Sequence, residues 1–233
     1  MEYMQHATAF AVAARPAVII SHRHQFIFFA VPRTATHAIR AALGPMLGDA
    51  DWQQQSLTEV VRLPVPALAR IGHGHVSFRQ VKACLPAETR DYFKFAMVRN
   101  PYDRFVSVCA MLNKRNPAYR GSETAFMKRA IGFPRFRSRV LVRPQWEMLV
   151  DDGDELRMDF VGRYETLQQS YDEACRLIGL PAAALATSNA SDHGLFPSYY
   201  DDELLSRVTD LYGADFQRFG YQTATTPEAL RCA

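Results

Sequence analysis

Two short runs of apolar residues stand out along the chain, and each leads into a turn and then into an amphipathic segment. The runs are FIFFAV at residues 26–31 and FKFAMV at residues 93–98. Continuous apolar and aromatic runs of this length, bounded by turn residues, are typical of strands that are buried on both faces of a sheet. The sequence therefore predicts two buried strands at these positions.

Four further segments have the spacing of a helix with one apolar face. They span residues 36–47, 102–112, 166–180 and 201–213, and the last opens with acidic residues, which suit a helix N-terminus. Strands that alternate with helices predict an α/β fold, a parallel β-sheet flanked by helices. In such a fold, ligands bind beyond the carboxyl ends of the strands.

The length and composition fit one globular domain without a membrane span. The chain has 233 residues, 48% of them hydrophobic, and we predict a single domain over residues 1–233. Arg15 and Pro16 interrupt the most apolar N-terminal stretch, and no segment approaches the roughly 20 apolar residues that a span needs. Four cysteines are scattered at Cys84, Cys109, Cys175 and Cys232, which indicates neither a zinc site nor a disulfide framework. We therefore expect a cytoplasmic protein.

Positive charge is concentrated between residues 113 and 143. Nine basic residues lie there against Glu123 alone, a local net charge of +8 in a chain of net charge +3: Lys114, Arg115, Arg120, Lys128, Arg129, Arg135, Arg137, Arg139 and Arg143. A solvated face explains such a run, because Lys and Arg are usually exposed. A docking surface for an anion explains it as well. A nucleic-acid binder would also use this charge, but it would leave two anion-binding turns unexplained.

The first of these turns is PRTAT at residues 32–36, between the first predicted strand and the first predicted helix. A strand, a tight turn and a helix N-terminus together present backbone N–H groups and a positive dipole end to an anion. Arg33 adds a fixed charge. The nucleoside-triphosphate loop GxxxxGK[ST] is absent, since the turn has neither glycine nor a Lys-Ser or Lys-Thr pair. Taken alone, the PRTAT stretch is also explained by an ordinary strand-to-helix turn that binds no anion.

The second turn lies in VRNPYDRFVSV at residues 98–108, which also follows an apolar strand. It places Arg99 at the end of the strand and Ser107 one to two turns into the next helix. Both side chains are then able to converge on one phosphate.

Together the two motifs resemble those of the sulfotransferases that use 3′-phosphoadenosine 5′-phosphosulfate (PAPS). The family patterns are P-K-[ST]-x-[ST]-[ST] and R-[DN]-P-x-x-R-x-x-S. The stretches at 143–149, 159–167 and 199–221 are similar to downstream signatures of the carbohydrate-type branch, which includes the uronyl 2-O-sulfotransferases. The resemblance covers roughly residues 26–221.

The resemblance implies a sulfotransferase fold with a P-loop-like turn that holds the 5′-phosphosulfate, and chemistry without a metal. The residues implied at the cofactor are Arg33, Thr34, Ala35, Thr36 and His37 in the first motif and, at the 3′-phosphate, Arg99 and Ser107 in the second. The product would be 3′,5′-adenosine bisphosphate. Arg33 replaces the usual Lys, as in tyrosylprotein sulfotransferases, and His37 replaces a usual hydroxyl residue. Arginine keeps a permanent charge, so anion binding is expected to survive, and Arg33 is also a candidate catalytic group.

A general base is expected in IGHGHVSF at residues 71–78. Histidine is the commonest general base. The uronyl 2-O-sulfotransferases carry a similar H-G-H-V stretch, in which the catalytic histidine matches His75, with His73 as a secondary site residue. Two alternatives stay open: a structural pair, or a metal site with His193 as the third ligand. The SHRH stretch at 21–24 has the same spacing but no motif context, and it predicts a surface segment.

For the acceptor, the resemblance implies a hydroxyl group on an anionic carbohydrate. We expect the 113–143 stretch to form the acceptor side of the site, with Arg135, Arg137 and Arg139 as binding residues. Alternatives are sulfation of tyrosine in an acidic peptide, and a nucleotide-binding protein that has lost catalysis. In the carbohydrate-type branch, a similar stretch borders the cofactor pocket, which implies possible contacts from Asn189, Ser191 and His193. The alternative is that these residues belong to a polar loop. A bacterial source is favoured because the Golgi relatives carry a membrane anchor.

Overall fold

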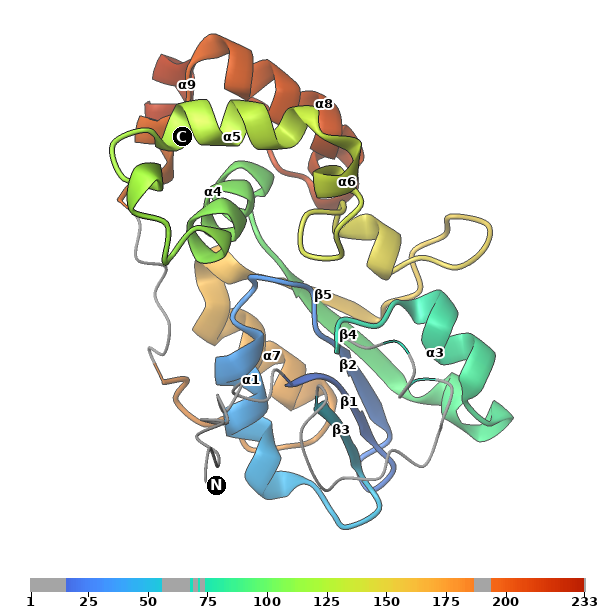
Figure 1. Ribbon diagram of the computed structural model, residues 1–233. Helices are drawn as coiled ribbons and strands as arrows, with labels where there is room; N and C mark the ends of the chain where they lie inside the picture. Colours follow the sequence, from blue (N-terminus) through green and yellow to red (C-terminus); the bar gives the residue numbers. More distant parts are fainter. Residues whose placement is uncertain (1–15, 56–67, 69–70, 72–73, 187–193, 233) are drawn as a thin grey trace, which may run out of the picture.

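The computed structural model describes residues 16–55, 68, 71, 74–186 and 194–232 (Figure 1). Its centre is a mixed sheet of five strands in the order β3-β1-β2-β4-β5. The strands are β1 Pro16–Ser21, β2 Phe26–Phe29, β3 Trp52–Gln55, β4 Phe93–Val98 and β5 Phe160–Arg163. The pairs β2–β4 and β4–β5 are parallel, whereas β1 is antiparallel to both β2 and β3.

Both predicted strands are present, and they are neighbours in the parallel part of the sheet. The prediction of a parallel sheet holds for β2, β4 and β5 but not for β1 and β3. A parallel crossover needs a dozen or more residues, and only residues 22–25 separate β1 from β2, so those two strands pair as a hairpin. At this turn Arg23 is exposed and His22 and His24 are half-buried, whereas Ser21 is fully buried, contrary to the surface prediction.

All four predicted helices are present, with different ends. The helices of the described residues are α1 Thr36–Leu43, α3 Phe78–Cys84, α4 Pro101–Leu112, α5 Glu123–Gly132, α6 Pro134–Arg137, α7 Leu167–Leu177, α8 Asp202–Phe219 and α9 Pro227–Cys232. The four predicted helices correspond to α1, α4, α7 and α8. The first stops before Gly44 and Pro45, where a 3₁₀ turn follows. The helix predicted to end at residue 213 is kinked at Tyr212, where φ is −112° and ψ is 18°, and then resumes as far as Phe219. Gly220 closes it with a left-handed φ of 64°.

Helices cover both faces of the sheet, which explains the uninterrupted apolar runs (Figure 1). Phe26 and Phe28 of β2 pack with residues of α1 and α7 on one face. Ile27 and Phe29 point to the opposite face, where α3 contributes Val81. Because successive side chains of a strand alternate between faces, a strand covered on both sides is apolar at every position.

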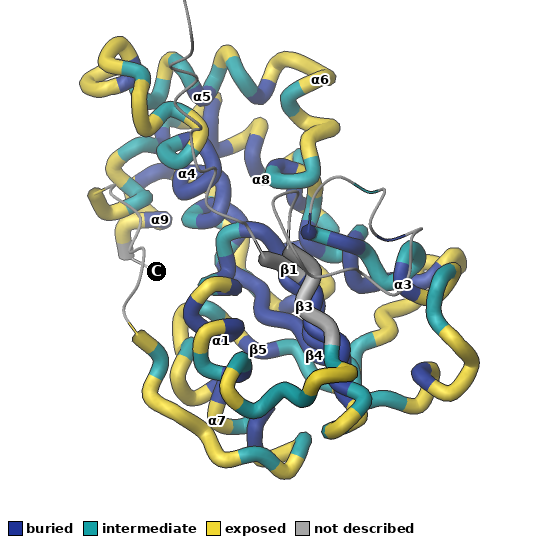
Figure 2. Tube along the Cα trace, turned by 60° about the horizontal axis from the view of Figure 1, so that its bottom comes forward, coloured by how far each residue is buried: buried dark blue, intermediate teal, exposed yellow. Residues whose placement is uncertain are grey.

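A third cluster joins α4 to α5, α8 and α9 at the end of the sheet where β2 and β4 finish (Figure 1). Buried residues gather along the central strands and α4, while the outer turns are exposed (Figure 2). Among the described residues, no helix combines the length and the apolar character that crossing a membrane requires. The carboxyl ends of β2 and β4 therefore lie under a packed helical layer, and both candidate turns begin there.

Candidate functional site

The turn after β2 has an unusual backbone. Arg33 and Ala35 have left-handed φ angles of 67° and 61°, and Thr34 lies between them. Alternation of this kind points successive backbone N–H groups to one side and forms an anion-binding concavity. The hydroxyl of Thr34 is buried and donates to the carbonyl oxygen of Val31 at 2.9 Å, which fixes the turn. Non-glycine residues in this region cost about 1–3 kcal/mol each, and such strain clusters at functional sites.

Helix α1 begins directly after this turn. Ala35 occupies its N-cap position, and the methyl side chain of alanine accepts no hydrogen bond. The first N–H groups of a helix without a side-chain cap are the donors that bind anions, and the helix dipole adds positive potential there. The geometry of residues 33–36 is therefore suited to a phosphate or sulfate group.

The second motif meets the first at this point. Arg33 Nε donates a hydrogen bond to Ser107 Oγ of α4 at 2.9 Å, and Arg99 Nη1 donates to the carbonyl oxygen of Arg33 at 3.2 Å. Arg99 is 4% exposed and Ser107 is fully buried. The structure thus brings together the Arg and Ser of the second motif and the Arg of the first, which are more than 60 residues apart in the sequence.

A further arginine, Arg104, holds the two turns in register. Its side chain is fully buried, and its Nε donates to the carbonyl oxygen of Pro32 at 3.1 Å. Its Nη2 donates to the carbonyl oxygens of Leu141 and Arg143 at 3.1 and 2.9 Å. The sequence signal for this residue is the second Arg of the pattern R-[DN]-P-x-x-R-x-x-S, to which no separate role was assigned.

His75 lies beside the same end of β2. Its Nδ1 is 2.8 Å from the carbonyl oxygen of Ala30, the residue that follows β2. Because a carbonyl oxygen only accepts hydrogen bonds, Nδ1 carries the proton in the neutral ring, and the lone pair is on Nε2. This is the tautomer that a base acting through Nε2 requires. Next to it, the carbonyl oxygen of Gly74 accepts from Val18 N–H of β1 at 3.2 Å.

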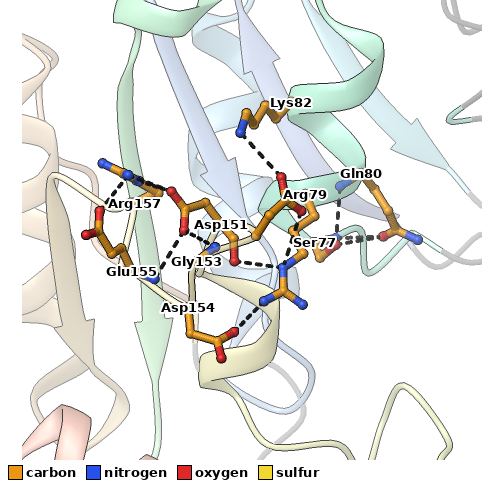
Figure 3. Close-up of polar contacts among 10 residues, drawn as sticks. Ser77, Arg79, Gln80, Lys82, Asp151, Gly153, Asp154, Glu155 and Arg157 are labelled. Atoms are coloured by element: carbon orange, nitrogen blue, oxygen red, sulfur yellow. Dashed lines mark hydrogen bonds and ion pairs between the residues drawn. The ribbon is translucent and has the colours of Figure 1, made fainter.

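The segment that carries His75 continues into α3, which is anchored at its start. Ser77 is the N-cap, and it exchanges hydrogen bonds with Gln80 in a capping box. Arg79 Nε donates to the carbonyl oxygen of Asp151 at 2.8 Å, and its guanidinium pairs with Asp154 (Figure 3). These contacts tie α3, and with it the His75 segment, to the chain around residue 151.

Asp151 organises that anchoring segment. Its carboxylate accepts from Arg157 Nε at 2.6 Å and from the backbone N–H groups of Gly153 and Glu155 at 2.9 and 3.2 Å (Figure 3). The hydrogen bond from Arg157, with help from those N–H groups, lowers the pKa of the Asp151 carboxyl below its usual value. The side chain therefore remains ionised and holds the turn closed.

Several predicted residues lie outside the described residues, namely His73, Asn189, Ser191 and His193. Among the residues that the structure does describe, no group of three or more His, Cys, Asp or Glu side chains is arranged to hold a metal ion. The alternative of a metal site built from the 73–75 pair and His193 therefore stays untested. His37 is placed on the exposed side of the first turn of α1.

The basic segment at residues 113–143, called the basic patch below, has eight of its nine basic residues exposed. Of its nine basic residues, Lys128 alone has an ion pair within the described part of the chain, with Asp201 at 2.8 Å and with Glu203. Arg135 and Arg137 lie on α6, with Arg139 just beyond it, and all three are exposed. An open hollow of about 600 Å³ in this patch is lined by Phe133, Pro134, Arg135, Phe136 and Arg139. Sequence analysis missed the aromatic residues, of which Phe133 is 57% exposed.

Comparison with known proteins adds one finding. A protein-family model described as "Sulfotransferase family" matches residues 16–222. Searches of curated proteins and of solved structures gave no match. The matched range contains the five described strands, both candidate turns, His75 and the basic segment.

Proposed function

Because the chain belongs to the sulfotransferase family, we propose that it moves the sulfuryl group of PAPS to a hydroxyl group of an anionic carbohydrate. The observation that carries this proposal is the contact between the two turns, in which Arg33 Nε donates to Ser107 Oγ. PAPS carries a phosphosulfate at its 5′ end and a phosphate at its 3′ position. A protein that binds it needs two neighbouring anion sites, and the two turns supply them.

Each turn has a role in the proposal. Residues 33–36 hold the 5′-phosphosulfate through their backbone N–H groups and the Arg33 guanidinium, and Arg99 and Ser107 hold the 3′-phosphate. In these roles Arg33 and the N–H groups stabilise the negative charge that collects on the 5′-phosphate when its bond to sulfur breaks. His75 Nε2 takes the proton of the acceptor hydroxyl as the oxygen bonds to sulfur. The products are a sulfate ester and 3′,5′-adenosine bisphosphate.

The acceptor side is assigned to the basic patch. Its arginines have no ion-pair partners among the described residues, so their charge is available for carboxylate or sulfate groups of the acceptor. The hollow beside Phe133 offers an apolar face next to Arg135 and Arg139. That combination suits a sugar ring that carries an acidic group. A tyrosine in an acidic peptide is the second candidate, favoured by the same patch and by arginine at position 33.

The nucleotide half of the proposal predicts a strong preference between two ligands. Because charge-assisted hydrogen bonds contribute about 1.5–3 kcal/mol each, 3′,5′-adenosine bisphosphate should bind about 100-fold more tightly than 5′-AMP. Ser107→Ala and Arg99→Ala should each remove most of that difference by weakening only the bisphosphate. Isothermal titration calorimetry measures both affinities.

Arg99→Ala leaves the carboxylate of Asp103 without the partner that it has at 2.7 Å, so the variant needs a check of folding by circular dichroism. Ser107→Ala removes one oxygen and is the milder test. Lys82→Ala, on the solvent side of α3, is a matched control that should leave both affinities unchanged. Equal affinity of the unmodified protein for the two nucleotides would contradict the assignment of the second turn.

The acceptor half predicts an effect on KM. Charge reversal of Arg135, Arg137 and Arg139 to glutamate should raise the acceptor's KM by about tenfold or more and should flatten its dependence on salt. Nucleotide affinity should stay close to that of the unmodified protein. Reversal of Arg176 and Arg231, exposed arginines outside the patch, is the control for a general change of charge. An unchanged KM in the triple variant would make the patch a solvated face.

A further inference from the structure

Three segments downstream of the two turns contain, apart from Arg143 of the basic patch, no residue that the proposed function uses for binding or chemistry. They are residues 143–149, 159–167 and 199–221, which lie far apart in the sequence and belong to different elements. In the structure the first two segments contact Arg99 or the next residue, Asn100, and the third segment supports the residues that make these contacts.

The first segment contributes Gln145, whose side chain is fully buried. Its Oε1 accepts from the backbone N–H of Arg99, and its Nε2 donates to the backbone carbonyl of Arg99, both at 2.9 Å. The amide thus pairs with both polar groups of a single residue, as a neighbouring strand would. This pairing fixes the backbone at the point where β4 ends and α4 begins.

The third segment holds Gln145 in turn. Asp215 of α8 is fully buried, and its carboxylate accepts from the backbone N–H groups of Gln145 and Trp146, each at 2.9 Å. Burial raises the pKa of the Asp215 carboxyl, while the Arg104 charge and these N–H groups act in the opposite direction. A buried carboxylate is tolerated only when it is satisfied in this way. The position of Arg99 therefore depends on a helix more than 100 residues away.

The second segment, residues 159–167, contacts the side chain of Arg99 and the backbone of the next residue, Asn100. The guanidinium carbon of Arg99 lies 4.0 Å from the centre of the Tyr164 ring. Glu165 Oε1 accepts from the backbone N–H of Asn100 at 2.6 Å, and its Oε2 accepts from the hydroxyl of Tyr221 at 2.9 Å. The stack on Tyr164 and the ion pair with Asp103 hold the Arg99 side chain in one orientation.

This arrangement leaves a defined part of the guanidinium for a ligand. Nε donates to Asp103 and Nη1 donates to the carbonyl oxygen of Arg33. Among the described residues, no protein atom accepts a hydrogen bond from Nη2. The protein therefore occupies Nε and Nη1, and Nη2 is the guanidinium nitrogen left for a ligand.

We propose that Gln145, Tyr164, Glu165 and Asp215 are positioning residues that orient Arg99 toward the 3′-phosphate and so set the preference for nucleotides that carry it. An arginine side chain carries about 2 kcal/mol of rotamer entropy, and a side chain that is already ordered does not lose this freedom when the ligand binds. The inference rests on the proposed function, because it takes the 3′-phosphate as the ligand of Arg99.

Tyr164 gives the cleanest test, because it is only half-buried and two variants separate its ring from its hydroxyl. Tyr164→Leu should lower the affinity for 3′,5′-adenosine bisphosphate by about tenfold, since it removes the aromatic face. Its affinity for 5′-AMP should not change. Tyr164→Phe keeps the ring and should bind both nucleotides as the unmodified protein does. Gln145→Leu should show the same selective loss if it folds, and calorimetry measures all of these affinities.

The outcomes separate this inference from the proposed function. A selective loss in Tyr164→Leu, rescued in Tyr164→Phe, supports the positioning role. If the unmodified protein prefers the bisphosphate and Tyr164→Leu keeps that preference, the positioning role is wrong and the proposed function stands. An equal loss for both nucleotides in Tyr164→Leu means a structural role only and overturns the inference. If the unmodified protein has no preference, both proposals fail.

Discussion

Replacing His75 with alanine is expected to lower kcat by about 10²–10⁴-fold, the range that general base catalysis typically contributes. The carbonyl oxygen of Ala30 holds Nδ1 as a donor, so the lone pair of the neutral ring is on Nε2, and the ring lies at the end of β2 that leads into the first turn. The affinity for 3′,5′-adenosine bisphosphate should stay within about twofold, because the proposed base would contact the acceptor and not the nucleotide. Steady-state kinetics and calorimetry on the same preparation measure the two quantities.

His24→Ala is a matched control, because it removes a half-buried histidine whose Nε2 contacts the carbonyl oxygen of Met46, away from the turns. It should have the activity of the unmodified protein, and His73→Ala should lose less than His75→Ala. The assignment of His75 is wrong if His75→Ala is fully active. It is also wrong if chelators inactivate the protein and zinc restores it, since that result would favour a metal site.

Replacing Arg33 with alanine is expected to lower kcat by about 10²–10³-fold, the usual effect of removing one donor that stabilises charge in the transition state. Arg33 has a left-handed backbone in the first turn, and its Nε donates to Ser107, so its charge lies between the two turns that we propose as anion sites. Arg33→Lys should recover much of the rate, because lysine keeps the positive charge. The recovery should be incomplete, because lysine lacks the several N–H donors of a guanidinium.

The kinetics of these variants are informative only if the turn keeps its shape. Alanine at position 33 meets the same left-handed backbone as arginine, so Arg33→Ala adds little new strain. Thermal unfolding of the unmodified protein, Arg33→Ala and Arg33→Lys provides the check. An Arg33→Ala variant that folds and retains the kcat of the unmodified protein would remove Arg33 from the catalytic residues.

The sequence predicted those parts of the fold whose pattern is local. The strands β2 and β4 are covered on both faces, so their apolar runs were easy to recognise. The edge strands were not predicted. β3 reads WQQQ and β5 reads FVGR, and neither four-residue sequence is a continuous apolar run. Strand β1, which pairs antiparallel with β2 and β3, was not predicted. Its PAVII run belongs to the apolar N-terminal stretch that was compared only with a membrane span.

The residues of the candidate site also fall into two groups, those in local motifs and those brought together by tertiary packing. The two turns and His75 lie in short contiguous motifs, so the sequence located them. Arg104, Gln145 and Asp215 support the same site but are buried polar residues whose partners are brought close only by tertiary packing. No local periodicity shows which backbone groups a buried glutamine or aspartate will satisfy.

The most direct test of the proposed function is mass spectrometry of acceptor pools after incubation with PAPS. The purified protein would be mixed with PAPS and with pooled anionic glycans and acidic peptides, with a heat-inactivated sample as the control. We predict that glycans gain one sulfuryl group on a hydroxyl and that an equal amount of 3′,5′-adenosine bisphosphate is released. Sulfation of tyrosine in the peptides alone would contradict the carbohydrate assignment. Nucleotide binding without a sulfated product from any acceptor would contradict sulfuryl transfer itself.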